Sequence, residues 1–109
     1  MNEKESEVQF EQICSELTQL HARKNHDYGN AFGRVYQEFA AQNSVMADGY
    51  ALGVLRVKVE RFKTLISNEA YVKKESIEDS LQDLACYAIM TLRERRIAKK
   101  SFQNESKQG

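Results

Sequence analysis

Proline is absent from all 109 residues of this chain, and this absence constrains the fold more than any other feature. Proline ends or kinks a helix because it lacks an amide hydrogen and its ring clashes with the preceding turn. No stretch of the sequence sustains the alternation of apolar and polar residues that a half-buried strand requires. The sequence therefore predicts an all-α fold.

Four segments carry apolar residues at the three- and four-residue spacing of amphipathic helices. The predicted helices cover about residues 6–27, 31–41, 49–67 and 77–99. Asp48 is a candidate N-cap for the third helix, and Ser76 is a candidate N-cap for the fourth. Short links between amphipathic helices favour a four-helix bundle. We expect residues 1–100 to form a single helical domain, followed by a mobile polar tail at 101–109.

The third predicted helix is apolar over an unusually wide arc. Its main stripe has a heptad-like spacing and consists of Leu52, Leu55, Val59, Phe62 and Ile66. Three further apolar residues lie outside that stripe, namely Val54, Val57 and Leu65. A helix with so wide an apolar arc contacts a second surface, so we predict a homodimer.

Charge and hydropathy exclude several classes of partner. Basic and acidic residues balance at 16 each, so the chain has no general basic field, and a polynucleotide partner is disfavoured. No apolar run approaches the roughly 18 residues of a membrane span, and the first residues are polar. We therefore expect no membrane association and a cytoplasmic location. Cys14 and Cys86 lack the spacing of a metal or redox motif and are predicted to be reduced core thiols.

Lys24 lies on the face of the first predicted helix that should point inward. One interpretation is that it lies in the last turn, interacts with the helix dipole and extends its ammonium group into solvent. The other is that Lys24, Asp27 and Tyr28 line one wall of a polar pocket, where Gly29 lets the backbone approach a ligand.

Lys58 and Arg61 are three residues apart on the third predicted helix and flank its apolar arc. Side chains at this spacing are neighbours, so the two cations can converge on one phosphate. Alternatively, each cation pairs with a carboxylate on a neighbouring helix.

The fourth predicted helix begins with a group of carboxylates, Glu78, Asp79 and Asp83. Asp79 and Asp83 are one turn apart and can ligate Mg²⁺, which itself bridges phosphate oxygens. For Asp79 there is a second interpretation, in which it forms a capping box with Ser76. Asp83 lies too far inside the helix to act as a cap.

Three strings together resemble the nucleotide modification associated domain 1 family of phages and bacteria, over about residues 17–92. They are Lys24-Asn-His-Asp-Tyr-Gly29, Lys58-x-x-Arg61 and Asp79-x-x-x-Asp83-Leu-Ala-x-Tyr87. That family is similar to the all-α, MazG-like nucleoside triphosphate pyrophosphohydrolases. The resemblance implies a helical bundle of MazG-like type, a place in phage or bacterial nucleotide metabolism, and a site that faces (deoxy)nucleotide phosphates.

The sequence departs from the active MazG-like enzymes, which hold Mg²⁺ with a Glu-x-x-Glu pair and a later Glu-x-x-Asp pair. Lys58-x-x-Arg61 stands where the first acidic pair is expected. If Asp83 matches the aspartate of the second pair, Ser80 replaces its glutamate. Cations in place of carboxylates favour direct binding of phosphates.

Three functions follow as hypotheses. The first is Mg²⁺-dependent cleavage of a (deoxy)nucleoside triphosphate, with Asp79 and Asp83 on the metal, the two cations on phosphates and Tyr28 near the base or sugar. The second is a nucleotide or signalling-nucleotide binder without turnover. The third is a helical protein-interaction module. No residue is assigned as the catalytic base.

Overall fold

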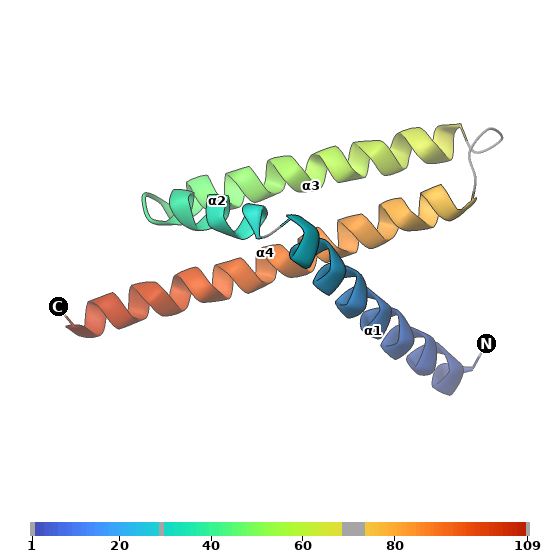
Figure 1. The fold of residues 1–109 in the computed structure, drawn as a ribbon, viewed down its shortest axis with the longest axis horizontal. Coiled ribbons are helices and arrows are strands. Elements are labelled where there is room, and N and C mark those ends of the chain that lie inside the picture. The colour runs from blue at the N-terminus through green and yellow to red at the C-terminus, as the bar shows by residue number, and fades with distance from the viewer. Residues whose placement is uncertain (1, 29, 69–73, 109) are drawn as a thin grey trace. The chain divides into compact units, whose positions relative to one another are not determined.

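The structure is a computed structural model that describes residues 2–28, 30–68 and 74–108, with side chains except at 27, 28, 74, 75 and 104–108. The described residues form four helices and no strand, so the all-α prediction is confirmed (Figure 1). These helices are α1 (Glu3–Tyr28), α2 (Ala31–Ala40), α3 (Ser44–Ser67) and α4 (Lys74–Gln108). None of them is long and apolar enough to cross a membrane.

The chain divides into two compact units, residues 1–30 and 31–109. The first unit is helix α1, and Asn2 caps its beginning by accepting a hydrogen bond from the Glu5 amide at 2.9 Å. Leu17 is the one residue buried in this helix among its described side chains. Cys14 is an exposed free thiol, contrary to the prediction, whereas Cys86 in the second unit is buried as expected.

The second unit contains the antiparallel pair α3 and α4, with α2 packed against both helices (Figure 1). Its core consists of two aromatic residues from α2 and two alanines from α3, namely Phe32, Tyr36, Ala47 and Ala51. The Phe32 ring stacks on Tyr50 with centroids 5.5 Å apart and meets the edge of Tyr87 at 5.4 Å. The aromatic side chains of α2 thus join the two long helices.

Helix α3 begins at Ser44, earlier than predicted, because Asn43 is its N-cap. The Asn43 side chain accepts hydrogen bonds from the amides of Val45 at 2.7 Å and Met46 at 3.4 Å. The assignment of Asp48 as the cap was therefore wrong. Asp48 lies inside the helix, where its carboxylate accepts a hydrogen bond from the Tyr36 hydroxyl at 2.7 Å.

Helix α4 also extends beyond its predicted bounds at both ends. It begins at Lys74, so Ser76 is a residue of its first turn and not its cap, and the capping-box interpretation of Asp79 is not supported. It continues to Gln108, through nearly all of the segment expected to be a tail. The sequence has no proline or glycine between these limits that would stop a helix.

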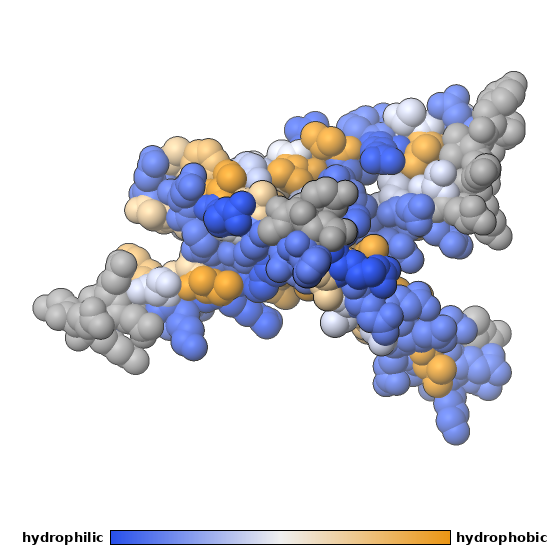
Figure 2. Space-filling view, in the orientation of Figure 1, coloured by the Kyte–Doolittle hydropathy of each residue, from blue (hydrophilic) through white to orange (hydrophobic). Residues whose placement is uncertain are grey.

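Much of the main apolar stripe predicted for α3 faces away from the core, although Leu55 and Phe62 are half-buried. Leu52, Val59 and Ile66 are exposed, and Figure 2 shows apolar side chains at the surface along α3. Ala47 and Ala51 are buried instead, and Val54 packs against the same cluster. The small alanines allow the α2 aromatic rings to approach the α3 backbone, which selects this line of the helix as the inner one.

Candidate functional site

Lys58 of α3 meets two residues of α4. Its Nζ lies 2.7 Å from Asp83 Oδ2 and 4.8 Å from the centroid of the Tyr87 ring. The side chains of Lys58 and Asp83 are only 23% and 17% exposed. We call Lys58, Asp83 and Tyr87 the Lys58 cluster. It is built by the antiparallel pairing of α3 and α4, since Asp83 and Tyr87 are one turn apart on the facing helix.

The Lys58 cluster holds an ammonium group at a defined place on the protein surface. The Asp83 carboxylate neutralises the charge, and the Tyr87 ring presents its electron-rich face to it. Because both partners are mostly buried, solvent screens the ion pair less than it would screen a surface pair. One of the two interpretations of the sequence was that Lys58 pairs with a carboxylate on a neighbouring helix, and the structure shows this pair. The other interpretation, that Lys58 binds a phosphate, stays a prediction.

Arg61 follows Lys58 by one turn of α3 and is exposed. Within the part of the chain that the structure describes, Arg61 makes no ion pair with a carboxylate. Its guanidinium group is therefore the cation beside the Lys58 cluster that can bind an incoming anion without first losing a partner.

The three carboxylates of the predicted metal site do not form one group. Asp79 is exposed and precedes Asp83 by one turn, so these two share a side of α4. Glu78 is also exposed, but it is five residues from Asp83 and projects from a different side of the helix. Among the described residues, no three His, Cys, Asp or Glu side chains are placed to hold a metal ion.

Lys24, Asp27 and Tyr28 belong to α1, which is a unit by itself. Lys24 is exposed, and the side chains of Asp27 and Tyr28 lie outside the described residues. The role of these three residues in nucleotide binding therefore stays a prediction.

Sequence reasoning missed a polar network between α2 and the long helices. Glu94 is only 2% exposed, and its Oε1 and backbone oxygen accept hydrogen bonds from Gln37 Nε2 at 2.9 and 3.0 Å. Arg93 Nε lies 2.7 Å from the other carboxylate oxygen of Glu94. In the sequence, Glu94 stands within a run of charged residues, which is typical of a solvated face. The network fixes α2 on α4 and leaves the Lys58 cluster as a separate group.

Tyr36 and Asp48 form a second link from α2, this time to α3. Burial raises the pKa of Tyr36 to about 12, and the hydrogen bond from its hydroxyl to Asp48 acts in the same direction. Arg95 of α4 lies 3.3 Å from the same Asp48 oxygen. The link therefore includes one residue from each helix of the second unit.

Ser80 is a buried polar residue whose Oγ has no hydrogen-bond partner among the residues that the structure describes. It lies one turn before Asp83 and Leu84 on α4. A hydroxyl group fits this enclosed position, whereas a carboxylate would have to be desolvated there.

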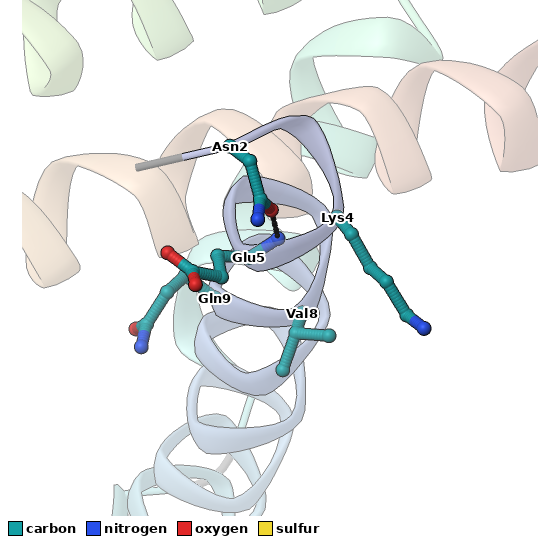
Figure 3. A pocket seen from close by; sticks show the side chains of 5 residues that line it. All are labelled: Asn2, Lys4, Glu5, Val8 and Gln9. Carbon is teal, nitrogen blue, oxygen red and sulfur yellow. Dashed lines mark hydrogen bonds between the residues drawn. The ribbon is translucent and has the colours of Figure 1, made fainter.

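A shallow hollow of about 310 Å³ lies at the beginning of α1 (Figure 3). It is lined by Asn2, Lys4, Glu5, Val8 and Gln9. Four of these residues belong to the first two turns of α1, and Asn2 directly precedes it, so the described lining comes from one end of a single helix. None of the predicted site residues lies in it.

The fold and the site define a small all-α protein with a fixed cation between two antiparallel helices. The chain belongs to the nucleotide modification associated domain 1 family, whose model matches residues 24–94, more than half of the chain. The matched segment includes α2, α3 and the whole Lys58 cluster. No curated protein and no solved structure matches the chain.

Proposed function

We propose that this protein binds a nucleotide through its phosphates, with Lys58 and Arg61 as the phosphate-binding residues. The observation that carries the proposal is the arrangement of two cations one turn apart on α3. One is fixed by Asp83 and Tyr87, and the other makes no ion pair with a described residue. The family description supports a nucleotide as the ligand that supplies the anion.

The ion pair within the Lys58 cluster determines how a phosphate reaches the site. Arg61 can receive two phosphate oxygens through its planar fork, but a phosphate at Lys58 comes close to the Asp83 carboxylate. Two anions at that distance repel each other. The repulsion is relieved when a divalent cation lies between the carboxylate and the phosphate, so we expect the metal complex of the nucleotide to bind better than the free nucleotide.

Asp83 and Asp79 are the residues that would hold such a cation. Mg²⁺ is commonly bound by one or two carboxylates together with substrate phosphates and water, and two carboxylates one turn apart fit that requirement. When bound, Mg²⁺ neutralises and polarises phosphoryl oxygens. Glu78 projects from another side of α4 and is at most an outer contributor to the site.

We favour binding without turnover, because cations occupy the place of the first acidic pair of the MazG-like enzymes. The second candidate is hydrolysis of a (deoxy)nucleoside triphosphate to the monophosphate and pyrophosphate, which the spacing of Asp79 and Asp83 supports. The proposal also includes a MazG-type bundle, a homodimeric state, a cytoplasmic location and a role in phage or bacterial nucleotide metabolism. Lys24, Asp27 and Tyr28 of α1 are also proposed as nucleotide-binding residues.

The test is a calorimetric titration of the full chain with ribo- and deoxynucleoside mono-, di- and triphosphates, each with and without Mg²⁺. We expect Arg61→Gln to weaken binding roughly 10- to 100-fold, as expected for loss of hydrogen bonds to a charged group. Arg56→Gln is the matched control, since Arg56 is also exposed on α3 but lies on a different side of the helix.

Three results would contradict the proposal: no nucleotide binds, both arginine variants lose affinity equally, or Mg²⁺ leaves the affinity unchanged. If Mg²⁺ has no effect on the affinity, the carboxylates do not belong to the site, and only the assignment of the two cations remains. Release of pyrophosphate in the same samples would make hydrolysis the leading function.

A further inference from the structure

Helix α3 carries a line of exposed apolar residues that repeats every seven positions. Val45, Leu52, Val59 and Ile66 are 75, 57, 46 and 46% exposed. Seven residues are close to two helical turns, so the four side chains follow one line along almost the whole helix. A seven-residue apolar repeat is the pattern by which one helix packs along another.

Helix α4 has a comparable line. Leu81 and Leu92 are 43 and 50% exposed and lie eleven residues apart, which is about three turns. In both helices, a rotation of about a third of a turn about the helix axis, in the sense in which the chain winds, leads from the core-facing line to the exposed line. Because α3 and α4 are antiparallel, the same rotation brings both lines to the same side of the pair. Helix α2 packs on the other side, where Gln37 contacts Glu94.

The core of the second unit is small for a domain of its length. Among its described residues, the buried apolar ones are Phe32, Tyr36, Ala47, Ala51 and Cys86, and two of these are alanines. Amphipathic helices become stable when each apolar stripe is covered by another layer. One side of the α3 and α4 pair is covered by α2, and no other described helix of the second unit covers the apolar residues on the other side.

We infer that a second copy of this chain covers the face formed by Val45, Leu52, Val59, Ile66, Leu81 and Leu92. This inference specifies the surface of the proposed homodimer and is independent of nucleotide binding. Six side chains that are about half exposed offer on the order of 500 Å² of apolar area. A standard interface buries roughly 800 Å² per partner, of which slightly more than half is apolar. The face therefore has the size that a stable dimer requires.

The occupant is a second copy because the face can pair with itself. In a two-fold symmetric dimer, the α3 and α4 pair of one copy packs face to face on the same pair of the other copy. The result is an assembly of four helices in which each apolar line contacts an apolar line of the other copy. The net charge of the chain is zero, so two copies approach without general repulsion. On α3, Lys58 lies near the core-facing line, about a third of a turn away from the proposed face.

The experiment compares two identical substitutions on α3. Val59→Glu places a carboxylate in the middle of the proposed face, while Val57→Glu places one on another side of the same helix, where Val57 is 66% exposed. Both variants have the same change in charge and helix propensity. Masses are measured for the full chain by sedimentation across micromolar concentrations, and circular dichroism checks that the helix content is kept.

We expect a dimeric wild type, a dimeric Val57→Glu variant, and a dissociation constant at least about 100-fold higher for Val59→Glu, because two carboxylates would be buried opposite apolar groups. Leu92→Glu on α4 should weaken dimerisation to the same extent, and this variant replaces Val59→Glu in the test if Val59→Glu fails to fold. A monomeric wild type would refute the homodimer itself. If Val59→Glu or Leu92→Glu dimerises with unchanged affinity, the assignment of the dimer surface is refuted. The assignment is also refuted if Val57→Glu weakens dimerisation as much as Val59→Glu does. Nucleotide titration of the same samples reports separately on the proposed function.

Discussion

Replacement of Asp83 by asparagine tests whether the Lys58 cluster is a structural element as well as a candidate phosphate site. Asp83→Asn keeps the size and one acceptor oxygen of the side chain but removes the charge that faces Lys58 at 2.7 Å. The Lys58 ammonium is then left against the Tyr87 ring with no formal counter-charge in the cluster. Because Lys58 is only 23% exposed, water compensates for this loss only in part.

The expected loss follows from the burial of the pair. Exposed ion pairs contribute about 0.2–1 kcal/mol. Removing one partner from a fully buried pair costs about 3–5 kcal/mol. Asp83 and Lys58 are mostly but not fully buried, so we expect Asp83→Asn to lower the free energy of unfolding by about 2 kcal/mol. In a chain of this size, that corresponds to a decrease in Tm of roughly 10 °C.

The assay is urea denaturation followed by circular dichroism, with Asp79→Asn as the control. Asp79 is exposed one turn earlier on α4, and its neutralisation should change the stability by less than about 0.5 kcal/mol. A double-mutant cycle with Lys58→Met should return a coupling energy of about 1–2 kcal/mol, as expected for residues in direct contact. If Asp83→Asn and Asp79→Asn are equally stable, the ion pair contributes nothing and the reasoning fails.

Three further predictions concern buried polar residues. Ser80→Ala should raise the free energy of unfolding by about 1 kcal/mol in urea denaturation, because the buried Oγ has no hydrogen-bond partner among the described residues. A lower free energy of unfolding would show that Oγ does have a hydrogen-bond partner. Glu94→Ala should lower it by roughly 3 kcal/mol, since the Gln37 amide loses its acceptor, whereas a change below about 0.5 kcal/mol would contradict the network. The pKa of Tyr36 is raised from 10.0 to about 12, so its stabilising contribution is complete below pH 10 and lost as the pH rises through 12. Tyr36→Phe should lack this alkaline loss, which is on the order of 2 kcal/mol. Parallel pH profiles of wild type and variant would show that the pKa of Tyr36 is not raised in the folded protein.

The helices themselves could be predicted because they depend on local properties of the chain. The absence of proline and the three- and four-residue apolar spacing act within single segments, and each of the four predicted helices is present. The same locality explains why the family could be recognised from short strings, since the model matches residues 24–94. Helix ends were less accurate, because the cap of α3 depends on which of several polar residues adopts the extended conformation, and that residue is Asn43 and not Asp48.

The inner side of α3 could not be predicted, because this helix is apolar on two sides. Leu52 and Val59 lie on the line with the larger side chains, and hydrophobicity alone assigns them to the core. The structure buries Ala47 and Ala51 instead, because their small side chains let the aromatic residues of α2 approach closely. This choice depends on the shapes of three helices at once, and no single segment contains that information.

The candidate site was predicted in its residues but not in its contacts. From the sequence, Lys58 is a candidate phosphate ligand and Asp83 is a candidate metal ligand. A carboxylate partner for Lys58 on a neighbouring helix was one alternative, but the sequence did not identify which carboxylate it is. The pairing of α3 with α4 brings Lys58 Nζ to within 2.7 Å of Asp83 Oδ2 and places Tyr87 beside it. Residues 25 positions apart meet only when two helices pack in a particular register. Such a contact is favourable only where the attraction between the two charges exceeds the cost of removing them from water, and the tertiary structure sets both quantities.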